Sequence, residues 1–375
     1  MSLLNPFLAR SLKLLVTTLV AFGLLGFVYL PQAQAVSLAA APSLVAYLPP
    51  GNAITNGKAL LRYSLPIDNA EIRKVQRTLE GLSEWLRSKR WGPVKKDITT
   101  VDRTLNRKGD KIIAAVMPEY RTATQGLIET LLSDLEDMRT ALENRDREAI
   151  WELRDKMLDQ VGEIESYMVA GFPYEVDDTY ADRPLLKGRA AVEFTTTQGP
   201  LTVVVDGYSA PVTGGNFVDL VQRGFYDGLP FIRAEDFYVL QTGDPEGPEE
   251  GFIDPNTQEY RSVPLEILVK GDTQPVYGET LEALGRYLDD PVLPFSAYGT
   301  VAMARPEEAP NGGSSQFFFF LFEPELTPAG LNLLDGRYSV FGYVTQGKDV
   351  LGQIKQDDRI ESARVVSGLE NFVTP

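Results

Sequence analysis

Two stretches of the sequence decide how this chain folds: Phe231-Ile-Arg-Ala-Glu-Asp-Phe-Tyr-Val-Leu-Gln-Thr-Gly-Asp244 and Ser314-Ser-Gln-Phe-Phe-Phe-Phe-Leu321. Each places polar side chains in a strongly apolar run that is typical of a β-strand. Arg233 and Gln241 stand eight residues apart, so an unbroken strand would point both to one face of a sheet. A guanidinium and an amide on an apolar face suit a groove that grips the amide bond of an extended peptide. The alternative is an arginine whose stem packs on apolar surface while its head reaches water.

Shorter motifs surround these two stretches in a fixed order along the chain. They are Ala210-Pro-Val-Thr213, Asn216-Phe217, Tyr226-Asp-Gly228, Met303-Ala-Arg305 and Leu334-Asp-Gly-Arg-Tyr-Ser-Val-Phe-Gly342. The ordered set resembles the cyclophilin family, whose members are peptidyl-prolyl cis–trans isomerases. The resemblance covers Leu186 to Val373, about half of the chain. It implies a closed antiparallel β-barrel with capping helices, and an enzyme that needs no cofactor and no metal.

The resemblance also assigns roles to individual residues. It gives Arg233 the catalytic role, Gln241 a contact with the peptide carbonyl or backbone, and Phe318 the floor of the proline socket. The other residues of the expected substrate-binding groove are Tyr238, Val239, Ala304, Arg305, Gln316, Leu333, Leu334 and Tyr338. Leu333 stands where cyclosporin-sensitive members have tryptophan, so we expect weak binding of that drug.

The chemistry of the reaction explains why an arginine suits it. Resonance holds an X-Pro amide planar, and the barrier to its rotation is roughly 20 kcal/mol. A protein lowers this barrier by binding the twisted amide more tightly than either planar form. In the twisted amide the proline nitrogen regains its lone pair, so a hydrogen-bond donor aimed at it binds more strongly there. A guanidinium is always charged, is a rigid fork of donors, and gains strength from a low local dielectric.

Composition excludes several other kinds of chemistry. The 375 residues include no histidine and no cysteine, which excludes Ser-His and Cys-His nucleophiles, thiol redox chemistry and the usual zinc ligands. The sequence has no glycine-rich phosphate loop, and no acidic spacing resembles a calcium loop. The net charge of −16 disfavours nucleic acid as a partner.

The first 35 residues are typical of a signal peptide. Arg10 and Lys13 precede an apolar run from Leu14 to Leu30, and Ala33-Gln-Ala35 matches a cleavage site. At 17 residues the run is at the lower limit for a membrane span, so an uncleaved anchor is the alternative. We expect cleavage, a mature chain that begins near Val36 outside the cytoplasm, and no later transmembrane span.

Periodicity divides the mature chain into a helical half and a strand-rich half. An extended, proline-containing segment, residues 36–66, precedes an up-down bundle of four amphipathic helices over residues 67–170. A capping box at Asp68-Asn-Ala-Glu71 begins the first helix, and Gly109 is a candidate break in the second. Residues 171–185 form an acidic, proline-containing linker.

The strand-rich half, residues 186–375, is the cyclophilin-like domain. A hairpin is expected from Arg189–Thr196 and Leu201–Val205, with a turn at Gly199-Pro200. The segment Pro211–Arg223 is expected to be a helix capped near Thr213.

An insertion over residues 245–302 makes this domain longer than minimal family members. It contains an acidic stretch, Glu246-Gly-Pro-Glu-Glu250, and a candidate helix over Glu279–Leu288. We expect the insertion to border the groove.

Charge is distributed unevenly between the two halves. Residues 36–170 contain 20 Lys and Arg against 20 Asp and Glu, whereas residues 171–375 contain 14 against 32. A basic cluster in the helical half consists of Arg87, Lys89, Arg90, Lys95 and Lys96. We hypothesise that this cluster contacts the acidic half, which would join the bundle to the isomerase domain; anionic lipid and plain solvent exposure are the alternatives.

The combination of signal peptide, helical bundle and acidic cyclophilin domain resembles a narrower group, the thylakoid-lumen cyclophilins of plants and cyanobacteria. Segments similar to that group's own are Arg261–Val269, Pro275–Gly278, Leu293–Phe295 and Val365–Asn371. A simple signal with one cleavage site favours a cyanobacterial version, exported to the thylakoid lumen or the periplasm. The resemblance implies help in assembly and repair of photosystem II, with proline-containing clients that include lumenal loops of its subunits.

Departures from the family pattern keep a second function open. Glu235 and Asp236 follow Arg233 closely, and either carboxylate could pair with the guanidinium and compete for the donor that catalysis needs. Tyr238 and Val239 also replace the usual Phe-Met pair. We therefore predict a weak prolyl isomerase; the alternative is a peptide-binding scaffold with little turnover that holds client segments with the groove and the bundle.

Overall fold

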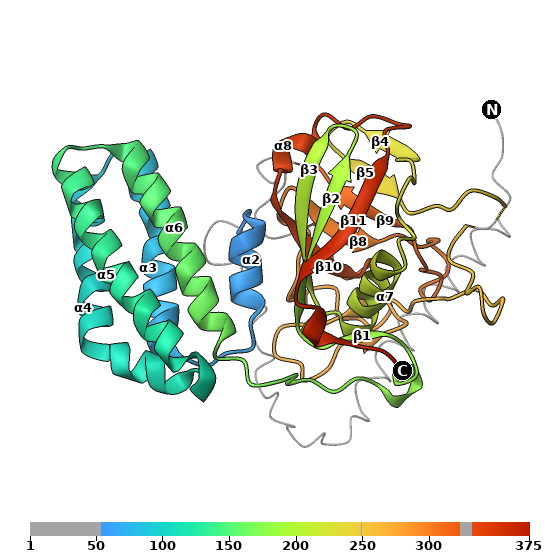
Figure 1. Ribbon diagram of the computed structural model, residues 1–375, viewed down its shortest axis with the longest axis horizontal. Coiled ribbons are helices and arrows are strands. Elements are labelled where there is room, and N and C mark those ends of the chain that lie inside the picture. The colour runs from blue at the N-terminus through green and yellow to red at the C-terminus, as the bar shows by residue number, and fades with distance from the viewer. Residues whose placement is uncertain (1–53, 249, 323–331) are drawn as a thin grey trace, which may run out of the picture. The chain divides into compact units, whose positions relative to one another are not determined.

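The computed structural model describes residues 54–248, 250–322 and 332–375 (Figure 1). The expected signal peptide, residues 1–35, and most of the expected extended segment lie outside the described residues. Within these ranges, no helix combines the length and the apolar character needed to cross a membrane.

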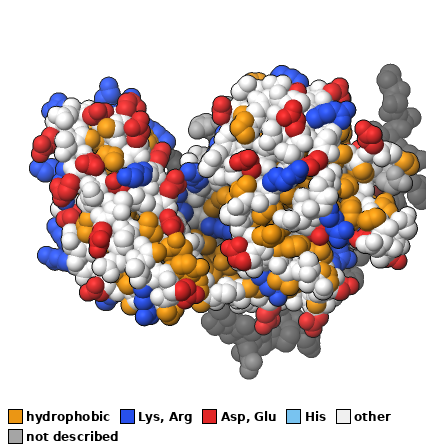
Figure 2. Space-filling model, viewed as in Figure 1, with side chains coloured by type: hydrophobic (Ala, Val, Ile, Leu, Met, Phe, Trp, Pro, Cys, Tyr) orange, Lys and Arg blue, Asp and Glu red, His pale blue; other side chains and the backbone are white. Residues whose placement is uncertain are grey.

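Four helices form the helical half: α3 (Ala70–Arg87), α4 (Trp91–Ala115), α5 (Arg121–Glu143) and α6 (Arg147–Ser166). Each packs against the next along the chain, and α6 also packs against α3. Their apolar stripes meet in one core, whose fully buried members include Ile72, Leu79, Leu131, Met157 and Val161. On the face shown in Figure 2, acidic and basic side chains are interspersed over these helices.

Two local expectations in the bundle need correction. The N-cap of α3 is Asn69 rather than Asp68, and the Asn69 side chain accepts a hydrogen bond from the N–H of Ile72 at 2.9 Å. The expected break at Gly109 is wrong, because α4 is continuous through it. A Cβ at Gly109 would lie 3.9 Å from Ile128 of α5, an ordinary van der Waals contact, so neither the helix nor its packing requires glycine here.

A curled antiparallel sheet with the order β11-β2-β3-β10-β8-β9-β5-β4 forms the strand-rich half. Its strands are β2 (Arg189–Thr196), β3 (Gly199–Asp206), β4 (Arg233–Glu235), β5 (Val239–Thr242), β8 (Thr300–Met303), β9 (Phe317–Phe320), β10 (Val340–Gln346) and β11 (Ile360–Ser367). Two further pairs are β1 (Leu185–Leu186) with β12 (Phe372–Val373), and β6 (Glu266–Ile267) with β7 (Val276–Tyr277). Helix α7 (Pro211–Gln222) and the short helix α8 (Lys348–Leu351) complete this half, with 3-10 turns at Asp178–Tyr180 and Leu369–Asn371; another such turn, Pro118–Tyr120, precedes α5.

The closed barrel that we expected is not formed by the described strands, which instead make this curled, open sheet. Strands β4 and β11 are its two edges, and no ladder joins them within the described residues. The chain beside these edges meets through an isolated bridge between Pro230 and Arg359, and the N–H of Phe231 donates to the carbonyl of Asp358 at 2.7 Å. Pro230 has no N–H to donate, which limits ladder formation at this edge.

The predicted hairpin is confirmed as β2 and β3, which appear side by side in Figure 1. Its turn lies at Thr197-Gln198, because Gly199 and Pro200 already belong to β3. Alternate residues of β2, such as Val192 and Phe194, are buried, and the Phe194 ring lies 6.2 Å from that of Phe217 of α7 in an aromatic core.

Two expectations about helices in this half are also wrong. The N-cap of α7 is Ala210 rather than a residue near Thr213. The buried carboxylate of Glu266, from the insertion, accepts hydrogen bonds from first-turn N–H groups, including that of Thr213 at 2.8 Å. Residues Glu279–Leu288 form turns instead of a helix, and Gly285 within them adopts a positive φ of 71° that interrupts helical geometry.

The expectation of an extended segment up to residue 66 is wrong in its last part. Gly57–Ser64 form helix α2, which begins after the N-cap Asn56 and packs against β10. Leu60 and Leu61 are buried in the same apolar cluster as Phe318 and Tyr343 of the sheet. An isolated helix of this length is not stable in water, so packing against the sheet is what stabilises α2.

Candidate active site

One row of side chains crosses the sheet near its β4 edge and forms the centre of the site. The register pairs Arg233 with Gln241, Gln241 with Phe318, and Phe318 with Ala302. Residues directly opposite one another on paired strands point to the same face of the sheet. The four side chains therefore lie in one line on one surface.

Arg233 and Gln241 share this face for a reason other than the expected one. The chain between them is not an unbroken strand, because a turn at Asp236-Phe-Tyr238 separates β4 from β5. Phe237 in this turn has a positive φ of 62°, and the N–H of Tyr238 donates to the carbonyl of Glu235 at 3.0 Å. The resulting hairpin places Arg233 directly opposite Gln241.

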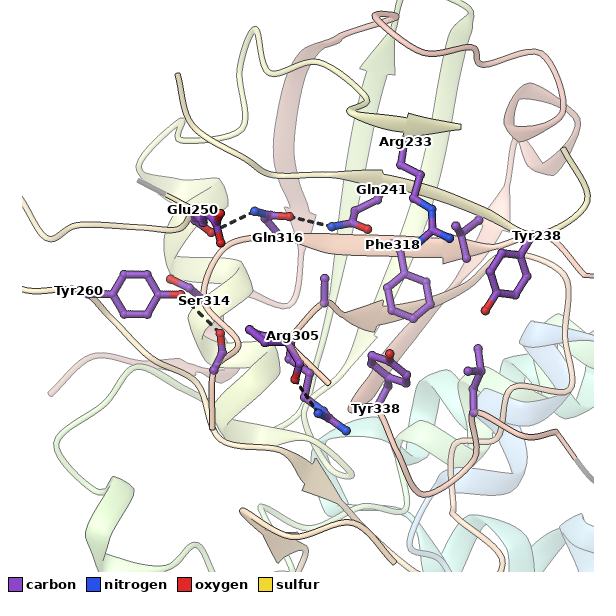
Figure 3. Close-up of a pocket in the computed structure, with 15 residues that line it drawn as sticks. Arg233, Tyr238, Gln241, Glu250, Tyr260, Arg305, Ser314, Gln316, Phe318 and Tyr338 are labelled. Carbon is purple, nitrogen blue, oxygen red and sulfur yellow. Dashed lines mark hydrogen bonds between the residues drawn. The ribbon is translucent and has the colours of Figure 1, made fainter. Parts of the chain in front are cut away.

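An open cavity of about 380 Å³ lies over this row (Figure 3). The structure brings ten of the predicted site residues together in its lining: Arg233, Tyr238, Val239, Gln241, Ala304, Arg305, Gln316, Phe318, Leu334 and Tyr338. Phe318 forms the apolar floor, and its ring lies 5.5 Å from that of Tyr338, edge to face, and 6.0 Å from that of Phe295.

Leu333 is the predicted groove residue that the structure places elsewhere. Its side chain is 87% exposed and does not line the cavity, whereas its neighbour Leu334 does. These residues belong to a turn, where adjacent side chains point in different directions, and sequence spacing alone does not show which of the two faces the cavity.

Five lining residues were not predicted: Glu250, Tyr260, Pro306, Gly312 and Ser314. Glu250 and Tyr260 come from the insertion, which confirms that it borders the groove. Pro306 and Ser314 could have been identified from their nearness to predicted residues, since Pro306 follows Arg305 and Ser314 lies two residues before Gln316; Gly312 gave no such signal.

A chain of amide hydrogen bonds runs along one wall of the cavity (Figure 3). Nε2 of Gln241 donates to Oε1 of Gln316 at 2.7 Å, and Nε2 of Gln316 donates to Oδ1 of Asp244 at 2.8 Å and to the carbonyl of Glu250 at 3.0 Å. Burial, followed by the charge of Glu250, raises the pKa of Asp244. The network fixes the orientation of both amides along this wall of the cavity.

Arg305 forms part of the opposite wall. Its guanidinium donates to the carbonyls of Arg337, Pro306 and Glu307 at 2.7–3.0 Å, and it lies 5.1 Å from the ring centroid of Tyr338. Burial is the main cause that lowers the pKa of Arg305. These contacts tie the loop after β8 to the loop before β10 and stabilise the shape of the cavity.

Arg233 is half-exposed at the rim of the cavity. Its Nε donates to Oε1 of Glu235 at 2.7 Å, and this hydrogen bond is the main cause that raises the pKa of Arg233. The neighbouring acid Asp236 instead accepts from Nζ of Lys355 at 3.2 Å. Of the two carboxylates expected to compete for the guanidinium, Glu235 is therefore the one that pairs with it.

Within the described residues, no group of three or more acidic side chains is placed to hold a metal ion. The polar side chains at the centre of the cavity include the guanidinium of Arg233 and the amides of Gln241 and Gln316, beside the aromatic floor of Phe318. This arrangement can bind a peptide, hold a proline ring on Phe318 and offer donors to an amide, while the hydroxyl of Ser314 in the lining donates to the carbonyl of Arg261 at 2.7 Å.

A curled antiparallel sheet with an arginine beside an aromatic socket and an amide-lined groove is the class of site that suits an extended, proline-containing peptide. Comparison with known families agrees with this class. The model for cyclophilin-type peptidyl-prolyl cis–trans isomerases matches residues 191–369. The model for the PsbQ-like domain of CYP38-like peptidyl-prolyl cis–trans isomerases matches residues 56–169.

Similar proteins cover both halves of the chain. A Synechocystis protein named as a thylakoid lumen peptidyl-prolyl cis–trans isomerase is 55% identical over 332 residues, which is 88% of each chain. Arabidopsis thaliana chloroplastic CYP38 is 48% identical over 92% of this chain and 81% of its own length, and chloroplastic CYP37 is 31% identical over 88% and 73%. The chain belongs to the cyclophilin-type peptidyl-prolyl cis–trans isomerase family.

Proposed function

We propose that the protein is a peptidyl-prolyl cis–trans isomerase of the thylakoid lumen that acts on proline-containing segments of client proteins. The observation that supports this function best is the row Arg233, Gln241 and Phe318, which combines a donor fork, an oriented amide and a proline floor in one cavity. The names of relatives that align over most of both chains support the activity and the compartment.

The geometry suggests a role for each member of the row. The proline ring packs on Phe318, which is 6% exposed and backed by Phe295 and Tyr338. The peptide backbone lies along the amides of Gln241 and Gln316. Arg233 donates to the proline nitrogen as the amide twists, so its interaction is stronger in the transition state than in either planar state.

The clients we propose are segments of photosystem II subunits that are exposed to the lumen during assembly and repair. The match of residues 56–169 to the PsbQ-like domain model supports a role of the bundle in this setting, because that domain accompanies the isomerase in CYP38-like proteins. The bundle would position the isomerase on its client rather than carry out chemistry.

A peptide-binding scaffold is the second candidate. The ion pair between Arg233 and Glu235 favours it, because a guanidinium already engaged by a carboxylate has less capacity for a new acceptor. Exposed pairs of this kind are weak, however, and contribute roughly 0–1 kcal/mol. The isomerase therefore remains the first candidate.

Exchange spectroscopy by NMR on a short X-Pro peptide tests the two candidates. The chain from Val36 should accelerate cis–trans exchange, and Arg233→Ala should remove about 99% of the acceleration, since one oriented charged donor in a transition state contributes on the order of 3 kcal/mol. The matched control is Arg87→Ala, which removes an exposed arginine of α3 and should leave the rate unchanged.

The outcomes separate the candidates. Peptide chemical shifts that change on binding, without any acceleration of exchange, would support the scaffold and reject the isomerase. An equal rate in the wild type and in Arg233→Ala would reject the assignment of Arg233.

A further inference from the structure

Two neighbouring side chains, Glu235 and Tyr238, contact the guanidinium of Arg233. Its Nε donates to Glu235, and its guanidinium carbon lies 5.7 Å from the ring centroid of Tyr238. In the described part of the chain, the two terminal nitrogens of Arg233 make no hydrogen bond with protein. Figure 3 shows the guanidinium directed toward Phe318, at the edge of the cavity.

Glu235 holds Arg233 from outside the cavity. The two residues are separated by Ala234 on β4, so both side chains lie on the same face of the sheet. The cross-strand partner of Glu235 is Val239, one row away from the Arg233–Gln241 pair. Glu235 does not line the cavity. A bound peptide would therefore meet the terminal nitrogens of Arg233 while the carboxylate engages Nε from behind.

Two other polar side chains near Arg233 make no hydrogen bond with it in the described part of the chain. The amide nitrogen of Gln241 donates to Gln316 at 2.7 Å, and the carboxylate of Asp236 accepts from Lys355 at 3.2 Å. Glu235 is thus the acidic side chain in this region that fixes the direction of the guanidinium.

We infer that Glu235 is a positioning residue, which turns the terminal nitrogens of Arg233 toward the bound proline. This inference rests on the proposed isomerase function. Arginine has five N–H donors, and the bond to Glu235 uses the one on Nε, so the four terminal donors stay available. Without Glu235 the guanidinium would sample more orientations, and fewer of them would be productive. Glu235 therefore supports catalysis, although the sequence led us to expect that it competes for the guanidinium.

Three single variants of the chain from Val36 test the inference by NMR exchange on an X-Pro peptide, with kcat and KM separated. Glu235→Ala should lower kcat about five- to tenfold with KM nearly unchanged, because the proline socket is untouched. Glu235→Gln keeps an oxygen that can accept from Nε and should retain at least half of the wild-type kcat. Asp236→Asn, the matched control, removes a neighbouring charge that does not contact Arg233 and should behave as wild type.

A double variant and a stability measurement exclude indirect effects. In an Arg233→Ala background, Glu235→Ala should have no further effect on the rate. The thermal midpoint should be the same for all variants, since exposed ion pairs contribute little to stability. A kcat that rises in both Glu235→Ala and Glu235→Gln would show competition, and a kcat unchanged in Glu235→Ala would show no role; either result overturns the inference.

A separate readout distinguishes failure of the inference from failure of the proposed function. The Nε–H signal of Arg233 in a nitrogen–proton correlation spectrum should exchange slowly with solvent in the wild type and quickly in Glu235→Ala. If the wild type does not accelerate exchange at all, the isomerase function fails. The Nε–H signal then decides the orientation: protection lost in Glu235→Ala supports it, and protection retained overturns it.

Discussion

At the scale of single residues, the close approach of α2 to the sheet depends on a glycine. Gly57 is buried at the first position of α2, and a Cβ built there would lie 2.8 Å from Cβ of Tyr343. Real side chains do not tolerate so short a contact, and Tyr343 is fully buried, so it has little room to move. Gly81 in α3 is the opposite case, because nothing lies within 4 Å of its Cβ position.

These two glycines predict opposite effects of the same substitution. Helix propensity alone favours alanine over glycine by about 1 kcal/mol in a helix interior. Gly81→Ala should therefore stabilise the protein by roughly 0.5–1 kcal/mol. Gly57→Ala should destabilise it by about 1–3 kcal/mol, because overpacking outweighs propensity. Urea unfolding of both variants checks this, and a stabilising Gly57→Ala would show that α2 does not pack closely on Tyr343.

At the scale of elements, α2 belongs to the core of the cyclophilin sheet although it precedes the bundle in sequence. Leu60 and Leu61 share an apolar cluster with Val239, Phe318 and Phe320, the strand residues that form and support the cavity floor. A fragment that begins at residue 171 would lack this cover. Domain boundaries drawn along the sequence therefore divide a unit that packs together.

Truncation of one leucine measures how much α2 contributes. Leu61 is 5% exposed, so Leu61→Ala should destabilise the protein by about 2–4 kcal/mol through lost burial and a cavity. Lys58→Ala on the same helix removes only an exposed ion pair to Asp159 and should change stability by about 0.5 kcal/mol or less. Denaturant unfolding compares the two, and equal effects would mean that α2 packs loosely.

At the scale of the whole molecule, hydrogen bonds continue from the sheet through α2 to the bundle. Ser64 at the end of α2 donates to the buried Asp206 of β3 at 2.6 Å, and Arg189 of β2 also pairs with Asp206 at 2.8 Å. Arg73 of α3 donates to the carbonyls of Arg62 and Leu65 at 2.8 Å each. A different contact between the two halves was expected from the basic cluster of the bundle, which consists of Arg87, Lys89, Arg90, Lys95 and Lys96. Within the described ranges, none of the ion pairs involves these five residues. The contact of this cluster with the acidic half stays a prediction.

Glu165 of α6 makes this junction sensitive to pH. Its side chain is fully buried and lies 3.2 Å from Arg73, with Arg62, Glu80 and Arg189 as the other charged groups that act on it. Burial outweighs the attraction of Arg73 and raises the pKa of Glu165 to about 7. The folded state therefore holds a proton on Glu165 between about pH 4.5 and 7 that the unfolded state releases, and stability falls as the pH rises through this window.

The prediction is that wild type loses stability between pH 5 and pH 8 relative to Glu165→Gln. One pKa unit corresponds to about 1.4 kcal/mol, so the difference should approach roughly 3 kcal/mol at most. Urea unfolding of both proteins at the two pH values measures it. Parallel pH profiles would show that Glu165 is already ionised at pH 5 in the folded protein.

Short-range patterns in the sequence were sufficient to predict the family, the bundle helices and ten residues of the cavity lining. Helical spacing and strand alternation are local properties, and the ordered motifs around Arg233 and Gln316 are specific, so both can be read without coordinates. Even Arg233 and Gln241 were placed correctly on one face, although by a wrong argument from an unbroken strand.

The remaining features depend on contacts between segments that are distant in sequence. The hairpin turn at Phe237, the cover that α2 gives the sheet, and the cap that Glu266 gives α7 arise from tertiary packing. The same holds at the site. Glu235 and Asp236 are adjacent acids, and the sequence alone does not show which of them pairs with Arg233. The alternation of side chains along β4 places Glu235 on the same face as Arg233, and Lys355 binds Asp236 instead. Side-chain direction is set by the fold, because a one-residue step along a strand or turn reverses the face that a side chain meets.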